Sequence, residues 1–166
     1  MEYFDLINKR YSCREYTDEK IKKEELNKIL EASNLAPTAV NFQPQKILVI
    51  ENPETLEKLK EGTKYTFNSK TILCVIHDTN VSWHRYRDQR DFGSFDSAIV
   101  TTYIVLAATN LNIGSCIVCS MDDKKVREIL NISDNYVIDS LITLGYPKNE
   151  GKINSRKNLD EIVEYR

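Results

Sequence analysis

The chain has 166 residues, of which 41% are hydrophobic and 29% are charged, as in ordinary globular proteins. Its 23 basic and 25 acidic residues give a formal net charge of −2, which excludes the basic surface typical of nucleic-acid-binding proteins. The longest apolar run, around residues 98–111, is too short to span a membrane. Charged Asp5, Lys9 and Arg10 interrupt the first apolar stretch, so we expect no secretion signal and a cytoplasmic location.

The first third of the chain predicts two helices and then an irregular segment. Apolar residues recur at helical spacing over residues 2–9 and again over residues 23–35. Pro37 disfavours helical geometry at the residue before it, so the second helix ends there. Residues 37–44 contain two prolines and no periodicity, which is typical of a loop.

Four short apolar runs predict buried strands, at residues 46–50, 71–76, 113–118 and 137–147. Further helices are expected between them. Asn52-Pro53 is a strong helix start that Gly62 can close. Asp122 or Asp123 caps a helix that runs to Leu130. Residues 78–93 have no clear pattern and are expected to form a loop or a short helix.

The segment from Ser94 to Asn112 predicts the most apolar helix of the chain. Its apolar residues cover nearly the whole circumference, which is typical of a helix buried on all sides. A chain of this size can hardly surround such a helix, so a subunit interface is its natural cover. No linker separates domains, and we expect one α+β domain over residues 1–166, with helices packed on a sheet.

Arg10, Ser12 and Arg14 are the first candidates for chemistry. In an extended segment these alternate residues project to one face, where two guanidinium groups and a hydroxyl suit a phosphate. The alternative is a solvated edge with ion pairs to Glu15 or Asp18.

Two further segments and one cysteine pair are also candidates. Asn41 and Gln43 offer amides that suit a heterocycle, or they serve only as turn residues. Arg156-Lys157 is a basic pair in the C-terminal tail, either a ligand site or a solvated surface.

Cys116 and Cys119 have C-x-x-C spacing, but in a strand their thiols point to opposite faces, and neither histidine supports a zinc site. No metal site is therefore expected.

Taken in order, these segments resemble the nitroreductase family. R-x-S-x-R at residues 10–14 resembles the phosphate-binding opening of that family, and A-P-T-A-V-N-F-Q-P at residues 36–44 resembles its A-P-S-x-x-N-x-Q-P loop. The stretch from Asp96 to Val118 resembles its long helix and the following L-G-x-G-S-C. G-Y-P at residues 145–147 and S-R-K at residues 155–157 resemble its ending.

The resemblance implies a mostly antiparallel sheet flanked by helices, and an intertwined homodimer with two FMN sites at the interface. Arg10, Ser12, Arg14 and Arg156 would hold the phosphate, with Tyr11 and Lys157 beside them. The partner would supply part of each site: Pro37, Thr38, Ala39 and Asn41. Asn68 and Lys70 would face the pyrimidine edge, Ile117 and Val118 would pack on the ring, and the amides of Cys119 and Ser120 would approach N5.

The implied activity transfers hydride from NADH or NADPH through flavin N5 to a small-molecule acceptor such as a nitroaromatic or quinone. Donor and acceptor would bind in turn, and no side chain need act as a nucleophile. Trp83, Tyr86 and Phe92 would line the acceptor pocket. Two alternatives stay open: a specialised flavin reaction such as dehalogenation or dehydrogenation, and a non-catalytic FMN-binding or redox-sensing protein.

Overall fold

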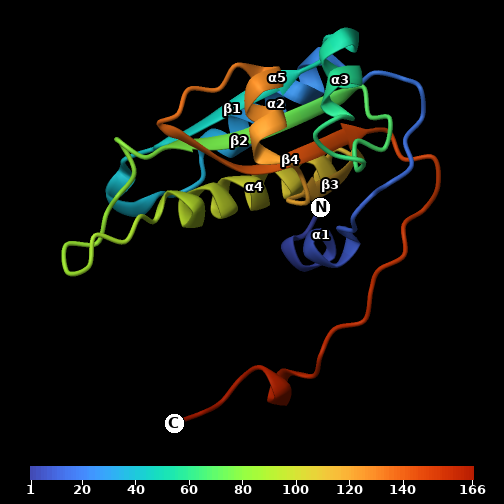
Figure 1. Cartoon of the computed structure of the whole chain (residues 1–166). Helices are drawn as coiled ribbons and strands as arrows, with labels where there is room; N and C mark the ends of the chain where they lie inside the picture. The colour runs from blue at the N-terminus through green and yellow to red at the C-terminus, as the bar shows by residue number, and fades with distance from the viewer.

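The computed structural model describes residues 1–166 and contains a four-stranded antiparallel sheet with the strand order β1-β2-β4-β3 (Figure 1). The strands are β1 (Gln45–Ile50), β2 (Thr71–Asp78), β3 (Gly114–Val118) and β4 (Tyr136–Gly145). The helices are α1 (Tyr3–Lys9), α2 (Lys23–Asn34), α3 (Pro53–Leu59), α4 (Gly93–Asn110) and α5 (Asp123–Leu130), with 3-10 turns at Ala39–Asn41 and Leu159–Glu161. The predicted α+β fold is confirmed.

Helices cover both faces of the sheet, and this explains why its strands are apolar throughout. On β2, Leu73 and Val75 belong to a core shared with α2 and α4, whereas Ile72 and Cys74 belong to a core shared with α3 and α5. Side chains of a strand alternate between the two faces. A strand that is covered on both faces therefore needs apolar residues at every position.

The predicted helix starts are confirmed, but the predicted role of Gly62 is wrong. The side chain of Asn52 accepts a hydrogen bond from the amide of Thr55 at 3.0 Å, and Asp122 caps α5 in the same way. Helix α3 ends at Leu59, and no glycine has a positive φ. A Cβ at Gly62 would lie 2.8 Å from a methyl group of Val126, so this glycine allows α5 to pack closely.

Helix α4 buries one face against the sheet and exposes the other. Val100 and Ile104 are fully buried, whereas Phe95 and Tyr103 on the outer face are 64% and 37% exposed. The single chain therefore does not surround this helix, as the sequence predicts, and its cover by a second subunit stays a prediction. The outer face of α4 is apolar, and no other part of the chain covers it.

Residues 84–91 form a hairpin where the sequence predicts a loop or a short helix. His84 pairs with Asp91 as an antiparallel bridge, and the amide of Arg85 donates to the carbonyl of Arg90 at 2.9 Å. Trp83 and Phe92 pack together at its base, with ring centroids 5.2 Å apart. The hairpin precedes α4 directly and projects from the sheet (Figure 1).

The C-terminal tail leaves the body of the protein after β4 (Figure 1). Tyr11 holds its start, because the tyrosine hydroxyl donates to the carbonyl of Asn149 at 3.2 Å and its ring packs on Gly151. Residues 152–166 are exposed throughout, apolar ones included. None of the helices combines the length and the apolar character that crossing a membrane requires.

Candidate functional site

The segment that carries Arg10, Ser12 and Arg14 lies along the edge of the sheet. Ser12 bridges Ser115 at the start of β3, and the amide of Cys13 donates to the carbonyl of Ser115 at 2.9 Å. These main-chain bonds keep the segment extended. Cys13 is buried, so the residues on either side of it project away from the core.

Tyr16 fastens this segment to β4, and sequence reasoning missed it. Its hydroxyl is buried and lies 2.8 Å from both the carbonyl oxygen of Cys13 and Oγ1 of Thr143. Burial raises the pKa of Tyr16 far above its ordinary value, so the hydroxyl stays neutral and can donate. Gly145 admits the tyrosine ring, because a Cβ there would lie 2.8 Å from it.

The structure brings Arg10, Ser12 and Arg14 together around one point of β3. Burial raises the pKa of the Cys116 thiol, while the charge of Arg14, a hydrogen bond from Ser12 and the charge of Arg10 oppose that rise. Neither arginine forms a salt bridge, so the predicted alternative of ion pairs is not found.

Ser115, the strand residue that pairs with Ser12, has a buried hydroxyl without a hydrogen-bond partner. Ser115 is 2% exposed, and its Oγ makes no hydrogen bond within the chain. Buried polar atoms are normally satisfied, so this unpaired hydroxyl, on the strand residue that pairs with Ser12, indicates a polar ligand. The donor set suits an anion.

Two cavities flank Tyr11 beside this segment. One of about 520 Å³ extends from Tyr11 past Gly114 and Ser115 to the start of the tail. Another of about 270 Å³ is lined by residues 11–15 and by the tail. Burial, and then the neighbouring Cys13, raise the pKa of Tyr11 to about 12, so its hydroxyl remains a donor.

Asn68 and Lys70 lie at the same end of the sheet but line a different cavity of about 520 Å³. Both are exposed, and Ser69 between them fixes the backbone by donating from Oγ to the carbonyl of Leu144 at 2.6 Å. That cavity also holds the ion pair of Lys20 with Glu51. The structure therefore does not place Asn68 or Lys70 in the cavities beside Tyr11.

The predicted loop at residues 37–44 is held in a defined shape. The amide of Ala39 donates to Asp96 on α4 at 2.9 Å, and the amide of Gln43 donates to Oγ1 of Thr38 at 3.0 Å. Val40 has φ 52° and ψ 19°, a conformation that branched side chains rarely adopt. Asn41, beside it, is exposed together with Pro37.

This loop and the arginine segment lie at opposite ends of α4. Asp96, which holds the loop, is in the first turn of the helix, whereas Lys9 binds Asn112 just beyond its last turn, with Nζ donating at 2.7 Å. A helix of 18 residues is roughly 27 Å long. One chain therefore does not bring Thr38 or Asn41 to Arg14.

The end of β3 presents main-chain donors and one apolar side chain. Ile117 is 42% exposed and Val118 only 5%, because neighbours on a strand point to opposite faces. Only the side chain of Ile117 is therefore available to a ligand on this face, and the roles of Ile117 and Val118 at a flavin ring stay predictions. The exposed amides of Cys119 and Ser120 donate to no acceptor within the chain.

The cysteine pair and the basic tail residues are also separated. Cys116 is buried on β3, whereas Cys119 is exposed after it, and both thiols are free. Arg156 and Lys157 lie in the exposed tail, which leaves the body of the protein after β4 (Figure 1). Within one chain only the start of the tail, as far as Asn154, lines a cavity together with the arginine segment.

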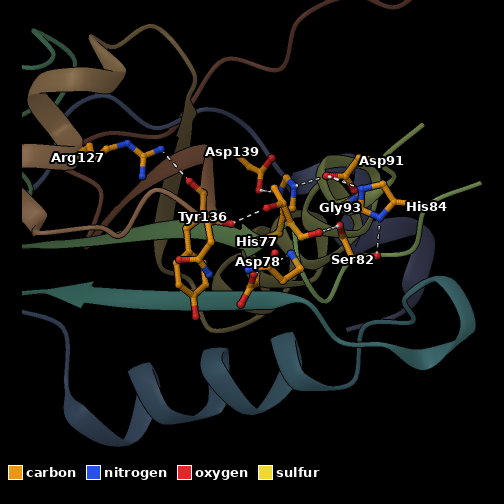
Figure 2. Close-up of polar contacts among 12 residues, drawn as sticks. His77, Asp78, Ser82, His84, Asp91, Gly93, Arg127, Tyr136 and Asp139 are labelled. Carbon is orange, nitrogen blue, oxygen red and sulfur yellow. Dashed lines mark hydrogen bonds and ion pairs between the residues drawn. The ribbon is translucent and has the colours of Figure 1, made fainter. Parts of the chain in front are cut away.

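A second cluster, which sequence reasoning missed, lies at the far end of β2 (Figure 2). His77 is 1% exposed, its Nδ1 lies 2.7 Å from a carboxylate oxygen of Asp139, and its Nε2 lies 3.3 Å from Asp91. His84 is near the same carboxylate. No group of side chains in the chain has the arrangement of a metal site.

Together, the fold and the site define an α+β protein with an extended, arginine-containing segment at the edge of its sheet. The sequence model of the nitroreductase family matches residues 7–70 and 62–146, and the chain belongs to this family. A relative from Archaeoglobus fulgidus, named NADH dehydrogenase/NAD(P)H nitroreductase, is 37% identical over 158 residues, which cover 90% of this chain and 87% of the relative.

Solved structures give the same family. A crystal structure of a nitroreductase family protein from Clostridium difficile is 33% identical, has a TM-score of 0.95, and covers 99% of this chain and 98% of that chain. Another protein of Clostridium difficile, described as an FMN-dependent nitroreductase, is 27% identical with a TM-score of 0.81 and 98% coverage of both chains.

Proposed function

We propose that the protein is an FMN-dependent NAD(P)H oxidoreductase that works as a homodimer. The observation that carries this proposal is the extended segment of Arg10, Ser12 and Arg14, in which Ser12 pairs with Ser115, whose buried hydroxyl is unpaired. Relatives named NAD(P)H nitroreductase and NADH dehydrogenase support the reaction class, and a relative described as FMN-dependent supports the cofactor.

The residues present fit FMN. Two guanidinium groups and two hydroxyls suit one terminal phosphate, which arginine binds through paired hydrogen bonds. Ile117 offers an apolar surface to the ring, and the free amides of Cys119 and Ser120 offer donors beside it. Bound FMN would supply N5, which accepts hydride from NADH or NADPH and passes it to a nitroaromatic, a quinone or a similar acceptor.

A second copy of the chain completes the proposed site. Because the loop at residues 37–44 and the arginine segment lie at opposite ends of α4, two chains with antiparallel α4 helices would pair each loop with the other chain's segment. The outer face of α4 would then be covered. The tail, which carries several exposed apolar side chains, would wrap the partner and bring Arg156 towards the phosphate.

The residues of the chain have separate tasks in this scheme. Arg10 and Arg14 bind the phosphate, and Tyr16 keeps their segment extended. Asp96 shapes the loop of its own chain, which enters the partner's site, and Lys70 would place positive charge near the pyrimidine edge of FMN, where it would stabilise negative charge during reduction. The hairpin and its aromatic base lie beside that loop and bound the space for the acceptor.

An absorbance spectrum of the purified protein, recorded before and after NADH and NADPH are added separately, tests this function. We expect flavin absorbance that is bleached by at least one donor and restored by a quinone, with FMN released on denaturation. Released FAD, or a colourless protein that does not take up FMN, contradicts the cofactor. Flavin that no donor reduces indicates a non-catalytic binder, and product analysis on a substrate panel detects dehalogenation or dehydrogenation.

A further inference from the structure

His77 connects the sheet to the hairpin through its two ring nitrogens (Figure 2). It is the last residue but one of β2, and it is almost fully buried. Nδ1 lies 2.7 Å from Asp139 on β4, and Nε2 lies 3.3 Å from Asp91 at the base of the hairpin. One imidazole therefore bridges the sheet and the base of the hairpin.

Both partners of the imidazole are carboxylates. An ionised carboxylate only accepts hydrogen bonds, so both ring nitrogens must donate, and only the protonated imidazole has two N–H groups. Burial lowers the pKa of His77, but the hydrogen bond and charge of Asp139, followed by those of Asp91, outweigh burial and raise it above its ordinary value. The other titratable groups nearby are His84, whose Nε2 is 4.0 Å from Asp91, and the partly exposed Asp78.

The chain passes unusually close to the imidazole. A Cβ at Gly93 would lie 2.1 Å from Cδ2 of His77, so only glycine allows the start of α4 to cross the ring. The amide of Gly93 also donates to Asp91 at 2.8 Å. Asp91 therefore receives hydrogen bonds from the sheet side and from the first residue of α4, and it fixes the hairpin to both.

We propose that His77 is a pH-sensitive clamp, which holds the hairpin against the sheet when the imidazole is charged and releases it as the pH rises. The proton that leaves is on Nε2, because Nδ1 has the shorter bond to Asp139. The lone pair that remains on Nε2 then faces an oxygen of Asp91 and repels it. The clamp itself needs no cofactor, and its effect on access for the acceptor rests on the proposed function.

The sign of the pH dependence follows from the raised pKa of His77. The charged imidazole stabilises the attached hairpin fully when the pH is below about 6.5, the ordinary pKa of histidine. This stabilisation is lost as the pH rises through the higher pKa that His77 has in the folded protein. Acidic conditions therefore favour the attached hairpin.

Trp83 is the only tryptophan of the chain and packs at the base of the hairpin, so its fluorescence reports on the clamp. The fluorescence of the purified protein is recorded between about pH 5.5 and 9. Hydrogen exchange of residues 79–93 is measured over the same range and corrected for the intrinsic effect of pH on the exchange rate. We expect a transition in both signals above about pH 6.5, and about tenfold faster exchange in the hairpin, while β2 and β4 keep their protection.

Two variants distinguish titration of His77 from titration of the neighbouring His84. Asp91→Asn should abolish the transition, because an amide can donate to neutral Nε2 as well as accept from it. His84→Gln should keep the transition. The proposal is overturned if the wild type shows no transition, if the transition survives Asp91→Asn, if His84→Gln removes it, or if the sheet loses protection together with the hairpin. None of these outcomes depends on bound FMN or on turnover.

Discussion

Arg10 and Arg14, unlike Arg85 and Arg166, have no anionic partner in the chain. Arg85 and Arg166 each bind a carboxylate, whereas Arg14 makes only a 3.5 Å contact with the carbonyl of Ser12. A guanidinium group that is not engaged by the protein keeps its hydrogen bonds for a ligand. Arginine binds phosphate more specifically than lysine does, because its donors form a rigid fork.

This difference predicts the order in which substitutions weaken FMN binding. Arg14→Ala and Arg156→Ala should each reduce affinity roughly tenfold to a hundredfold, since a charge-assisted hydrogen bond contributes about 1.5–3 kcal/mol. Arg10→Ala should behave similarly, and Lys157→Ala should have a smaller effect. Fluorescence titration of the apoprotein with FMN measures the four affinities. Equal affinities in all four variants would show that the assigned roles are wrong.

Single residues also mark the limit of sequence reasoning. The spacing of Arg10, Ser12 and Arg14 is visible in the sequence because the three residues are neighbours on one extended segment. His77 gave no such signal, since its partners Asp139 and Asp91 are 62 and 14 residues away. Only the pairing of β2 with β4 brings the first of them to the imidazole.

Among the elements, the segment from Ser12 to Thr17 depends on Tyr16 for its position. Tyr16→Phe removes a buried hydroxyl and leaves Thr143 and the carbonyl of Cys13 with one partner fewer. The free energy of unfolding should fall by about 1–3 kcal/mol, as expected for unpaired buried polar groups. Urea denaturation measures this change.

Tyr146→Phe is the matched control for Tyr16→Phe. The hydroxyl of Tyr146 donates to Glu25 at a partly exposed position, where water can replace it. Its removal should cost less than about 1 kcal/mol. Equal destabilisation by the two variants would mean that Tyr16 does not hold the segment in the proposed way. A weaker affinity for FMN in Tyr16→Phe alone would link the segment to the cofactor.

Elements were predictable where a local pattern decides the structure. The caps at Asn52 and Asp122 and the four apolar strands are of this kind. The role of Gly62 was not predictable because its small size serves the packing of α5, which the local sequence does not reveal. The hairpin at residues 84–91 was not predictable because its turn has no glycine and its aromatic base depends on contacts with α4.

For the whole molecule, the exposed outer face of α4 predicts a stable dimer. Phe95 and Tyr103 lie on that face, and a typical specific interface buries roughly 1,600 Å². Sedimentation at micromolar concentration should show a dimer, and Tyr103→Glu should weaken it. Val49→Glu, at an exposed position on β1, should leave the dimer unchanged. A folded monomer with bound flavin would contradict the shared site.

The size of the molecule also predicts its kinetics. The chain has only the short segment at residues 79–93 to bound an acceptor pocket, so donor and acceptor should use one space in turn. Turnover with NADH or NADPH at several fixed quinone concentrations should therefore give parallel double-reciprocal lines, the signature of a ping-pong mechanism. Intersecting lines would instead indicate a ternary complex and a second pocket.

The separation of the two half-sites by the length of α4 has a genetic consequence. In the proposed dimer, a chain with Arg14→Ala and a chain with Asn41→Ala damage different halves of a site. When both alleles are expressed together, each mixed dimer has one site with both lesions and one site with none. With random pairing, about one quarter of all sites are intact, so two inactive alleles complement each other. Arg10→Ala and Arg14→Ala damage the same half, and every site of their mixed dimer carries a lesion.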